Sequence, residues 1–249
     1  MWPPASILLT CTPAPDVPRA VIPSGVDTKR FRPRDEAGTA KRLRILFVGR
    51  LEPQKGLAAL TSISAGLLSA HPDVEIWVAG NDTPSAPGGH TWREHWKACL
   101  GTEALARCRF LSHVAWAEMP GVYRQCDVLV LPSVRDNLPN VALEAMACGL
   151  SVVASDTAGM GPVIQHGRSG LLLSTKNIDT WIAALAGLAA NRRRLASLGR
   201  SARDTIAAQY DLRAMSEQVL DLCARACRRS VPRHTVLQAA GSAPGGGAP

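Results

Sequence analysis

The sequence predicts an α/β protein with a doubly wound, Rossmann-like parallel sheet of about six strands, followed by helices at its C-terminal end. Short apolar runs of strand type alternate with helical segments between Arg44 and Leu173. Strands buried on both faces of a parallel sheet have this continuous apolar character, and each crossover between them requires a helix. With 46% apolar residues but only three Phe and two Tyr, the 249-residue chain must fill its core mainly with aliphatic side chains.

The expected elements follow one another in alternation along the chain. The expected strands are 44–51, 74–80, 109–112, the run VLVLP from 128, 151–155 and 170–173. One helix is expected to begin near Lys55, and the next carries Trp92 and Trp96 as core residues. Further helical segments are expected at 119–126, after Pro139, as a turn at VIQHG, and at 177–189, 191–208 and 213–229. We expect a linker or truncated lead-in over 1–20, one domain over 21–212, a C-terminal helix over 213–230 and a disordered tail over 231–249.

The net charge of +8 is unevenly distributed, since residues 190–249 hold ten Arg and four acids. We expect a solvated helical face there. The alternative is a peripheral contact with anionic lipid through Arg225, Arg228, Arg229 and Arg233. Basic and aromatic residues do not interleave, so the sequence does not favour nucleic-acid binding.

The seven cysteines indicate a cytoplasmic protein with reduced thiols and no structural metal. Their number is odd, and Cys126, Cys148 and Cys223 fall in apolar segments, so we expect them in the core. The start, MWPPASILLTC, has no basic region and only a short apolar run. It is therefore expected to be neither a signal peptide nor a membrane span.

The segment Asp127 to Ser155 organises the candidate site. Glu144 is the only charged residue from Leu138 through Ala154, on a short apolar helix, where an unpartnered carboxylate would be costly. Asn140 is predicted to cap this helix and to share a face with Glu144 near the positive helix end, which suits a phosphate or hydroxylated ligand. Asp136 lies in the preceding turn and can reach the same space. The alternative is that Glu144 pairs with a buried Arg and Asp136 only shapes the turn.

A second group of candidate residues follows the first strand. Gly49 lets backbone approach a ligand, and Arg50 and Lys55 place two cations at the same sheet edge. A pyrophosphate suits this position, while two surface cations are the alternative. Ligands of open α/β sheets bind outside the carboxyl ends of the strands, where both groups are expected.

Four motifs in this order resemble the C-terminal donor-binding domain of the glycosyl transferases group 1 family, whose members have two Rossmann-like domains (the GT-B fold) and retain anomeric configuration. The motifs are IPSGVDTKRF, VGRLEPQKG, DVLVLPSVRDNLPNVALEAMACGLSVVAS and RSGLLL. They span about 21–210 and are far more specific than a lone glycine pattern. The resemblance implies transfer of a sugar from a nucleoside diphosphate to an acceptor hydroxyl, in polysaccharide, lipopolysaccharide or glycolipid synthesis.

The resemblance also implies roles for individual residues. Arg50 and Lys55 would neutralise the donor diphosphate as the sugar leaves. Asp136 would contact hydroxyls of the transferred sugar, and Glu144 those of the ribose. Backbone donors to sugar and phosphate would come from Asn137, Leu138, Pro139 and Asn140, while Ser112, His113 and Val114 would line the base pocket. No metal or other cofactor is implied, and no Asp-X-Asp pair was found.

Three features depart from the family pattern. Asp136 stands where Glu is commoner, which shortens its reach by one methylene. The usual Gly-Gly-X-Pro-Glu turn reads Ala158 to Pro162 and lacks the Glu. The acceptor-binding domain that precedes the Gly-Val-Asp motif in the family has no counterpart, so we expect a separate chain to supply it or this sequence to be a fragment.

The resulting interpretation is the donor-binding half of a glycosyltransferase, with a nucleotide sugar as its ligand. One alternative is a non-catalytic nucleotide-sugar-binding subunit or a remnant without the acceptor domain. Another is a nucleotide-sugar epimerase, which shares the fold but is disfavoured by the DNLPN and EAMACG segments.

Overall fold

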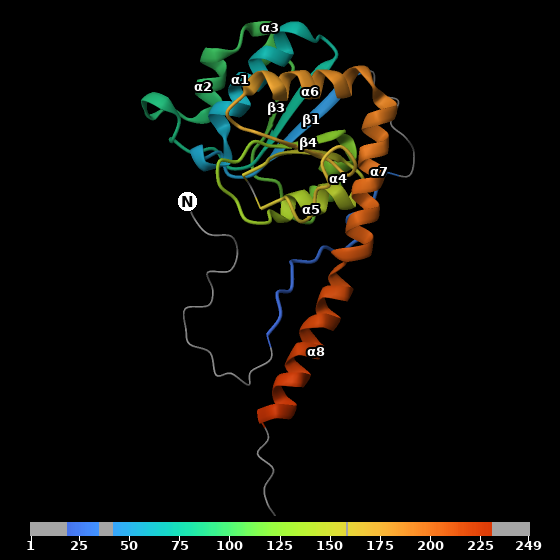
Figure 1. Cartoon of the computed structure of the whole chain (residues 1–249). Helices are drawn as coiled ribbons and strands as arrows, with labels where there is room; N and C mark the ends of the chain where they lie inside the picture. The colour runs from blue at the N-terminus through green and yellow to red at the C-terminus, as the bar shows by residue number, and fades with distance from the viewer. Residues whose placement is uncertain (1–18, 35–41, 158, 231–249) are drawn as a thin grey trace, which may run out of the picture. The chain divides into compact units, whose positions relative to one another are not determined.

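The computed structural model describes residues 19–34, 42–157 and 159–230. Its centre is a six-stranded parallel sheet in the order β3-β2-β1-β4-β5-β6, which confirms the predicted α/β class (Figure 1). The strands are β1 (Leu43–Val48), β2 (Val74–Ala79), β3 (Cys108–Leu111), β4 (Val128–Leu131), β5 (Ser151–Ser155) and β6 (Leu171–Leu173). The helices are the short η1 (Pro53–Lys55) and η2 (Pro87–Gly89), then α1 (Leu57–Ala70), α2 (Trp92–Cys99), α3 (Thr102–Leu105), α4 (Met119–Gln125), α5 (Asn140–Ala147), α6 (Ile178–Ala190), α7 (Arg192–Gln209) and α8 (Leu212–Ser230).

Two core layers lie on the two faces of the sheet, because side chains alternate along each strand. Ile45 and Phe47 of β1 pack with α1, α2 and α6. Leu46, between them in sequence, packs with α4 and α5 on the other face. Helix α7 contributes its first half to one layer and its second half to the other. Trp92 and Trp96 are 3% and 1% exposed, which confirms the prediction that both are core residues.

The strand order reverses between β1 and β4, the two central strands. Strands β2 and β3 extend the sheet on one side of β1, and β5 and β6 extend it beyond β4, so the loops after β1 and β4 leave the same edge in neighbouring positions. Such a switch point is where doubly wound sheets bind ligands. Gly56, at φ +76°, lets these loops touch, since an added Cβ would overlap the Pro132 carbonyl.

The structure corrects two details of the predicted elements. Helix α5 begins at Asn140 itself, with extended Pro139 (φ −73°, ψ 125°) in the capping position and no capping side chain, so Asn140 is not the predicted cap. Proline fixes its own φ, and its carbonyl accepts from the Ala142 N–H at 2.9 Å. VIQHG is not a helical turn, because the turn closes earlier with the Met160 carbonyl accepting from the Ile164 N–H, after which His166 bridges to Gly170.

The cysteine prediction holds for two positions and fails for a third. Cys126 and Cys148 are 2% and 4% exposed, whereas Cys223 is exposed on α8 and is not a core residue. Some residues of an apolar helical segment face solvent, and the composition of the segment does not show which ones. Burial raises the pKa of the Cys126 and Cys148 thiols to about 12, so both stay protonated at neutral pH.

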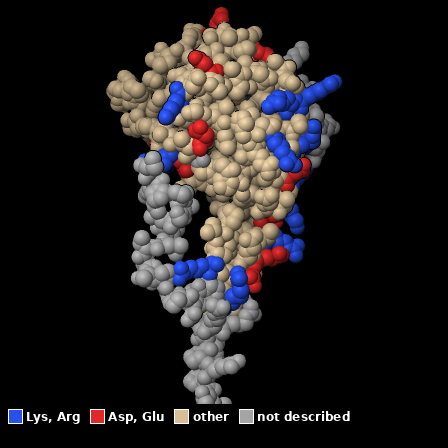
Figure 2. Space-filling model, viewed as in Figure 1, with Lys and Arg blue, Asp and Glu red and all other residues tan. Residues whose placement is uncertain are grey.

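The chain divides into two compact units, Pro23–Met215 and the two chain ends, Met1–Ile22 with Ser216–Pro249. Every residue of the candidate site belongs to Pro23–Met215. The predicted lead-in and tail lie largely outside the described residues. Within the described ranges, no helix has both the length and the apolar character that crossing a bilayer requires. Figure 2 shows Lys and Arg next to Asp and Glu at several places on one face. Asp127 pairs with both Arg34 and Arg192.

Candidate functional site

Lys55 and Asp136 meet at the switch point, an ion pair that the sequence analysis did not predict, although it expected both residues at this sheet edge. The Lys55 Nζ lies 2.6 Å from the Asp136 Oδ2, and the two side chains are 25% and 16% exposed. Asp136 also accepts from the Ser133 hydroxyl at 3.4 Å and from the Asn137 N–H at 3.1 Å. The carboxylate therefore both shapes its own turn and holds the lysine from the β1 loop. Because an ammonium has three N–H donors, Lys55 can bind an anion while it keeps this contact.

Arg50 leaves the same sheet edge but lies mainly in solvent. Its side chain is 67% exposed and pairs with Glu52 at 2.9 Å. One of five guanidinium N–H donors is engaged there, so most remain available to a phosphate. Gly49 lies between β1 and Arg50, and its N–H donates to the Ala79 carbonyl at 3.0 Å. This bond ties the loop after β1 to the end of β2.

The turn between β4 and α5 is held by its neighbours. The Gly159 N–H donates to the Asp136 carbonyl at 3.1 Å, and an added Cβ at Gly159 would lie 2.8 Å from the Asn137 carbonyl. Of the four predicted backbone donors, Asn137, Leu138 and Asn140 have an N–H group, whereas Pro139 has none and is withdrawn from that role. Leu138 packs against the apolar layer beneath α5, which anchors the turn.

Glu144 is 8% exposed and is held by two neutral donors. The Trp116 indole Nε1 donates to its Oε1 at 3.1 Å, and the Tyr123 hydroxyl donates to its Oε2 at 2.8 Å. This excludes the alternative in which Glu144 pairs with a buried Arg among the described residues. Burial raises the Glu144 pKa, while the Tyr123 and Trp116 hydrogen bonds oppose that rise.

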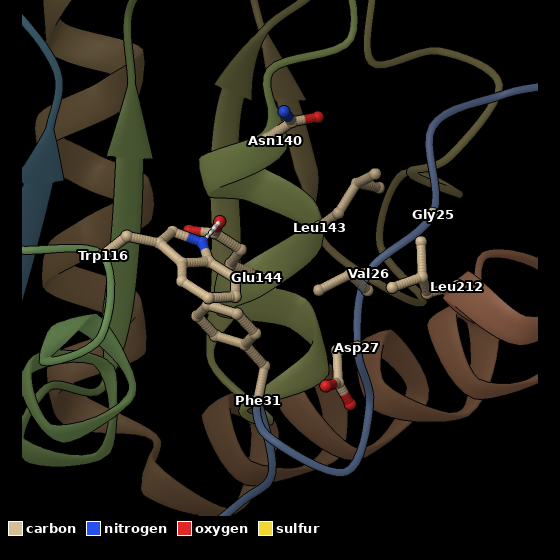
Figure 3. A pocket seen from close by; sticks show the side chains of 9 residues that line it. All are labelled: Gly25, Val26, Asp27, Phe31, Trp116, Asn140, Leu143, Glu144 and Leu212. Carbon is tan, nitrogen blue, oxygen red and sulfur yellow. Dashed lines mark hydrogen bonds between the residues drawn. The ribbon is translucent and has the colours of Figure 1, made fainter.

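A cavity of about 220 Å³ opens beside Glu144, between α5 and the segment that precedes Phe31 (Figure 3). Asn140, Leu143 and Glu144 face it from α5, which confirms that Asn140 and Glu144 share one helix face. One carboxylate, two aromatic rings and aliphatic groups line the remainder. Together with the Asn140 amide and the Glu144 carboxylate, they suit a hydroxylated ligand. The lining residues are Gly25, Val26, Asp27, Phe31, Trp116, Asn140, Leu143, Glu144 and Leu212.

The predicted base-pocket segment follows β3 at the same edge of the sheet. Ser112 and His113 are exposed, while Val114 is partly buried against the core layer of α4 and α5. The Ser112 carbonyl accepts from the Gly80 N–H at 3.0 Å, and its hydroxyl accepts from the Arg93 guanidinium at 3.5 Å. The segment is thus fixed through its backbone, with polar side chains facing outward.

The predicted residues form two neighbouring groups rather than one pocket. Lys55 and Asp136 are in direct contact, but neither they nor Arg50 line the cavity beside Glu144. Trp116 and Tyr123 were not predicted, although both bind Glu144. The described residues contain no group of three or more His, Cys, Asp or Glu side chains able to hold a metal ion.

Comparison with known proteins identifies relatives over most of the chain. The family described as "Glycosyl transferases group 1" matches residues 42–191. The D-inositol 3-phosphate glycosyltransferase of Corynebacterium jeikeium is 36% identical over 179 residues, which cover 68% of this chain and 42% of that protein. The chain thus spans less than half the length of this relative.

Two solved structures share the fold. Sucrose-phosphate synthase of Thermosynechococcus elongatus matches with a TM-score of 0.73 and 25% identity, over 84% of this chain and 53% of that protein. Anabaena Alr3699/HepE, solved in complex with UDP and glucose, matches with a TM-score of 0.70 and 20% identity, over 82% of this chain and 56% of that one.

Proposed function

Since the chain belongs to the glycosyl transferases group 1 family, we propose that it is the donor-binding half of an enzyme that transfers a sugar from a nucleoside diphosphate to an acceptor hydroxyl, with retention of configuration. The donor is the first partner in this proposal, and an acceptor-binding domain on the same or a separate chain is the second. Synthesis of a polysaccharide, lipopolysaccharide or glycolipid is the proposed setting, in the cytoplasm.

The contact between Lys55 and Asp136 at the switch point carries the proposal. It joins a cation from the β1 loop to an acid from the β4 loop, at the edge where doubly wound sheets bind nucleotides. A diphosphate needs cations, and a sugar needs hydroxyl acceptors, so one donor molecule would use both. The ligands in the Alr3699/HepE structure, UDP and glucose, are of this chemical class.

In the proposed mechanism, cationic side chains stabilise the leaving nucleoside diphosphate. Negative charge grows on the diphosphate as the glycosidic bond breaks, and Arg50 and Lys55 would neutralise it. Asp136 would orient the transferred sugar, and Glu144 would accept hydrogen bonds from the ribose. Backbone N–H groups of Asn137, Leu138 and Asn140 would complete the contacts to sugar and phosphate. Side-chain cations thus replace a bound metal in this proposal.

A ligand-induced thermal shift tests the proposal directly. We expect at least one of UDP, ADP and GDP to raise the melting temperature, because a ligand at 100 times its Kd adds about 2.7 kcal/mol to the free energy of unfolding. For a domain of this size, each kcal/mol corresponds to about 2–4 °C. Glu144→Ala is expected to abolish the shift.

Glu103→Ala provides the matched control, since Glu103 is exposed on α3 and should leave the shift unchanged. Absence of any shift with all three nucleotides at millimolar concentration would contradict the proposal. A shift without sugar transfer, even after an acceptor-binding domain is added, would instead favour the alternative of a non-catalytic subunit.

A further inference from the structure

The hydrogen bonds to Glu144 are arranged symmetrically, with one neutral donor on each oxygen. Trp116 comes from the loop between β3 and α4, and Tyr123 comes from α4 itself. A carboxylate has about four acceptor positions, so two remain open. Because Glu144 lines the cavity beside α5, a ligand there can reach those positions (Figure 3).

Trp116 is held in place although it is 54% exposed. The Arg30 guanidinium stacks 3.9 Å from the centre of the indole ring, and the Phe31 ring lies 5.6 Å away at 60°. These contacts fix the plane of the indole, so that its N–H points at Glu144. An exposed tryptophan without such contacts would sample several rotamers and lose this hydrogen bond.

Tyr123 is fixed by burial instead. Its side chain is fully buried, and its ring meets Phe31 edge-on at 6.0 Å. Burial and the adjacent Glu144 charge raise the Tyr123 pKa, so the hydroxyl keeps its proton and remains a donor at all physiological pH values. Phe31 therefore contacts both aromatic rings that bind the carboxylate.

We propose that Trp116 and Tyr123 are positioning residues that hold the Glu144 carboxylate so that its two open acceptor positions receive the vicinal 2′- and 3′-hydroxyls of a ribonucleotide. This inference rests on the proposed donor-binding function. It assigns the ribose selectivity of the site to two side chains outside the motifs that identify the family. Neither of them needs to touch the ribose for this role.

The pH dependence of binding distinguishes positioning from simple packing. Both hydrogen bonds stabilise the charged carboxylate, so removing either one should raise the Glu144 pKa further. The binding that requires the carboxylate is present above this pKa and is lost as pH falls through it. The groups facing Glu144 are Trp116 and Tyr123, with Cys148 directly after its helix, Asp27 across the cavity and Arg30 behind the indole.

The experiment measures nucleotide affinity against pH for wild type, Trp116→Phe and Tyr123→Phe. UDP, ADP and GDP are compared with their 2′-deoxy forms. We expect the acid limb of ribonucleotide binding to move to higher pH in both variants, with about a tenfold loss of affinity on that limb. The preference for ribo over 2′-deoxy nucleotides should shrink as well.

The matched control is Trp181→Phe, which also removes an indole hydrogen bond, here to the Ser174 carbonyl at 2.9 Å in the other core layer. It should leave the pH profile unchanged. An equal loss of affinity at every pH, or no loss, in the two test variants would overturn the inference while wild-type binding upholds the proposed function. Failure of wild type to bind any of the nucleotides would instead refute the function itself.

A second readout does not depend on nucleotide. The 13C chemical shift of the Glu144 carboxyl carbon reports its titration in the free protein, and both variants should titrate at higher pH than wild type. An unchanged titration would overturn the positioning role even if affinity falls. If Tyr123→Phe does not fold, the Trp116→Phe variant tests the inference alone, because Trp116 is half-exposed and its replacement should not prevent folding.

Discussion

Arg50 and Lys55 leave the same loop but have different surroundings. Lys55 is one quarter exposed and neutralises a partly buried carboxylate, whereas Arg50 is two thirds exposed and pairs with Glu52. Exposed ion pairs contribute little to stability, because solvent screens them and side-chain entropy opposes them. Replacing Lys55 should therefore lower the stability more than replacing Arg50, whereas both replacements should weaken ligand binding.

We predict that Arg50→Met changes the free energy of unfolding by less than about 0.5 kcal/mol, while Lys55→Met lowers it by about 1–3 kcal/mol. The second variant leaves Asp136 without its cation. Both variants should weaken nucleoside diphosphate binding by about tenfold or more, since in the proposed function each removes a charged contact to the diphosphate. Urea denaturation and calorimetric titration give the two quantities. Equal destabilisation by both variants would contradict this prediction, because the exposed Arg50–Glu52 ion pair would then stabilise the fold as much as the Lys55–Asp136 pair.

At the residue scale, the sequence predicted which sheet edge carries the loop residues, but not the contacts of Glu144. Lys55 and Asp136 follow two central strands, and topology brings the ends of such strands together. Trp116 and Tyr123 precede Glu144 by 28 and 21 residues, and their hydrogen bonds depend on how α4 packs. Nothing in a single sequence distinguishes an aromatic residue that binds a carboxylate from one that only fills the core. A costly lone carboxylate was the available signal, and it indicated that partners exist without naming them.

At the element scale, the site depends on the close approach of the loops after β1 and β4. Gly56 ends η1 and precedes α1, and its N–H donates to the Pro53 carbonyl at 2.9 Å. Its φ of +76° is unfavourable for other residues, and the Pro132 carbonyl occupies the space of a Cβ. Lys55 comes directly before this glycine, so the loop geometry determines whether it reaches Asp136.

We predict that Gly56→Ala lowers the free energy of unfolding by about 2–3 kcal/mol, since it combines left-handed strain with overlap. It should also weaken nucleoside diphosphate binding, because Lys55 moves with the loop. Gly187→Ala is the matched control: Gly187 lies inside α6 and has open space around its Cβ position. Alanine at position 187 should raise the free energy of unfolding by about 0.5–1 kcal/mol. Destabilisation of similar size at both positions would contradict this account of Gly56.

The positions of elements were predictable where apolar runs are continuous. The predictions failed where a single local contact determines where an element begins or ends. All six strands follow from their apolar letters, with ends that differ by up to three residues. The VIQHG segment was expected to form a helical turn, but the Met160 carbonyl closes only one turn before the chain extends toward β6. The start of α5 shifted by one residue because Pro139 occupies the cap. Such local choices depend on neighbouring loops, which a sequence pattern does not contain.

At the scale of the whole molecule, the chain forms one Rossmann-like sheet and spans about half the length of the relatives that it matches. It covers 42% of the Corynebacterium jeikeium relative and 53% of the sucrose-phosphate synthase structure. In the proposed function, the described residues bind the donor, and transfer additionally requires a surface that holds an acceptor.

Helix α8 raises the question of a membrane contact. Leu212, Val219 and Leu220 are 41%, 40% and 68% exposed, and Arg225 pairs with Asp221 at 3.0 Å. From Leu212 to Cys227 the helix carries two Arg and two acids, so its net charge there is zero. Since each net cation near an anionic surface contributes about 1 kcal/mol, this stretch has little electrostatic attraction for lipid.

We predict that the chain does not float with phosphatidylserine vesicles at physiological salt beyond its background with neutral vesicles. The three exposed aliphatic side chains in the described part of α8 are too few for stable insertion without electrostatic help. Flotation that rises with anionic lipid content and falls with salt would contradict this and assign the attraction to the Arg residues after Cys227. Replacing Arg228, Arg229 and Arg233 with Gln would then remove it, whereas Arg225→Gln should not, because its charge is already offset by Asp221.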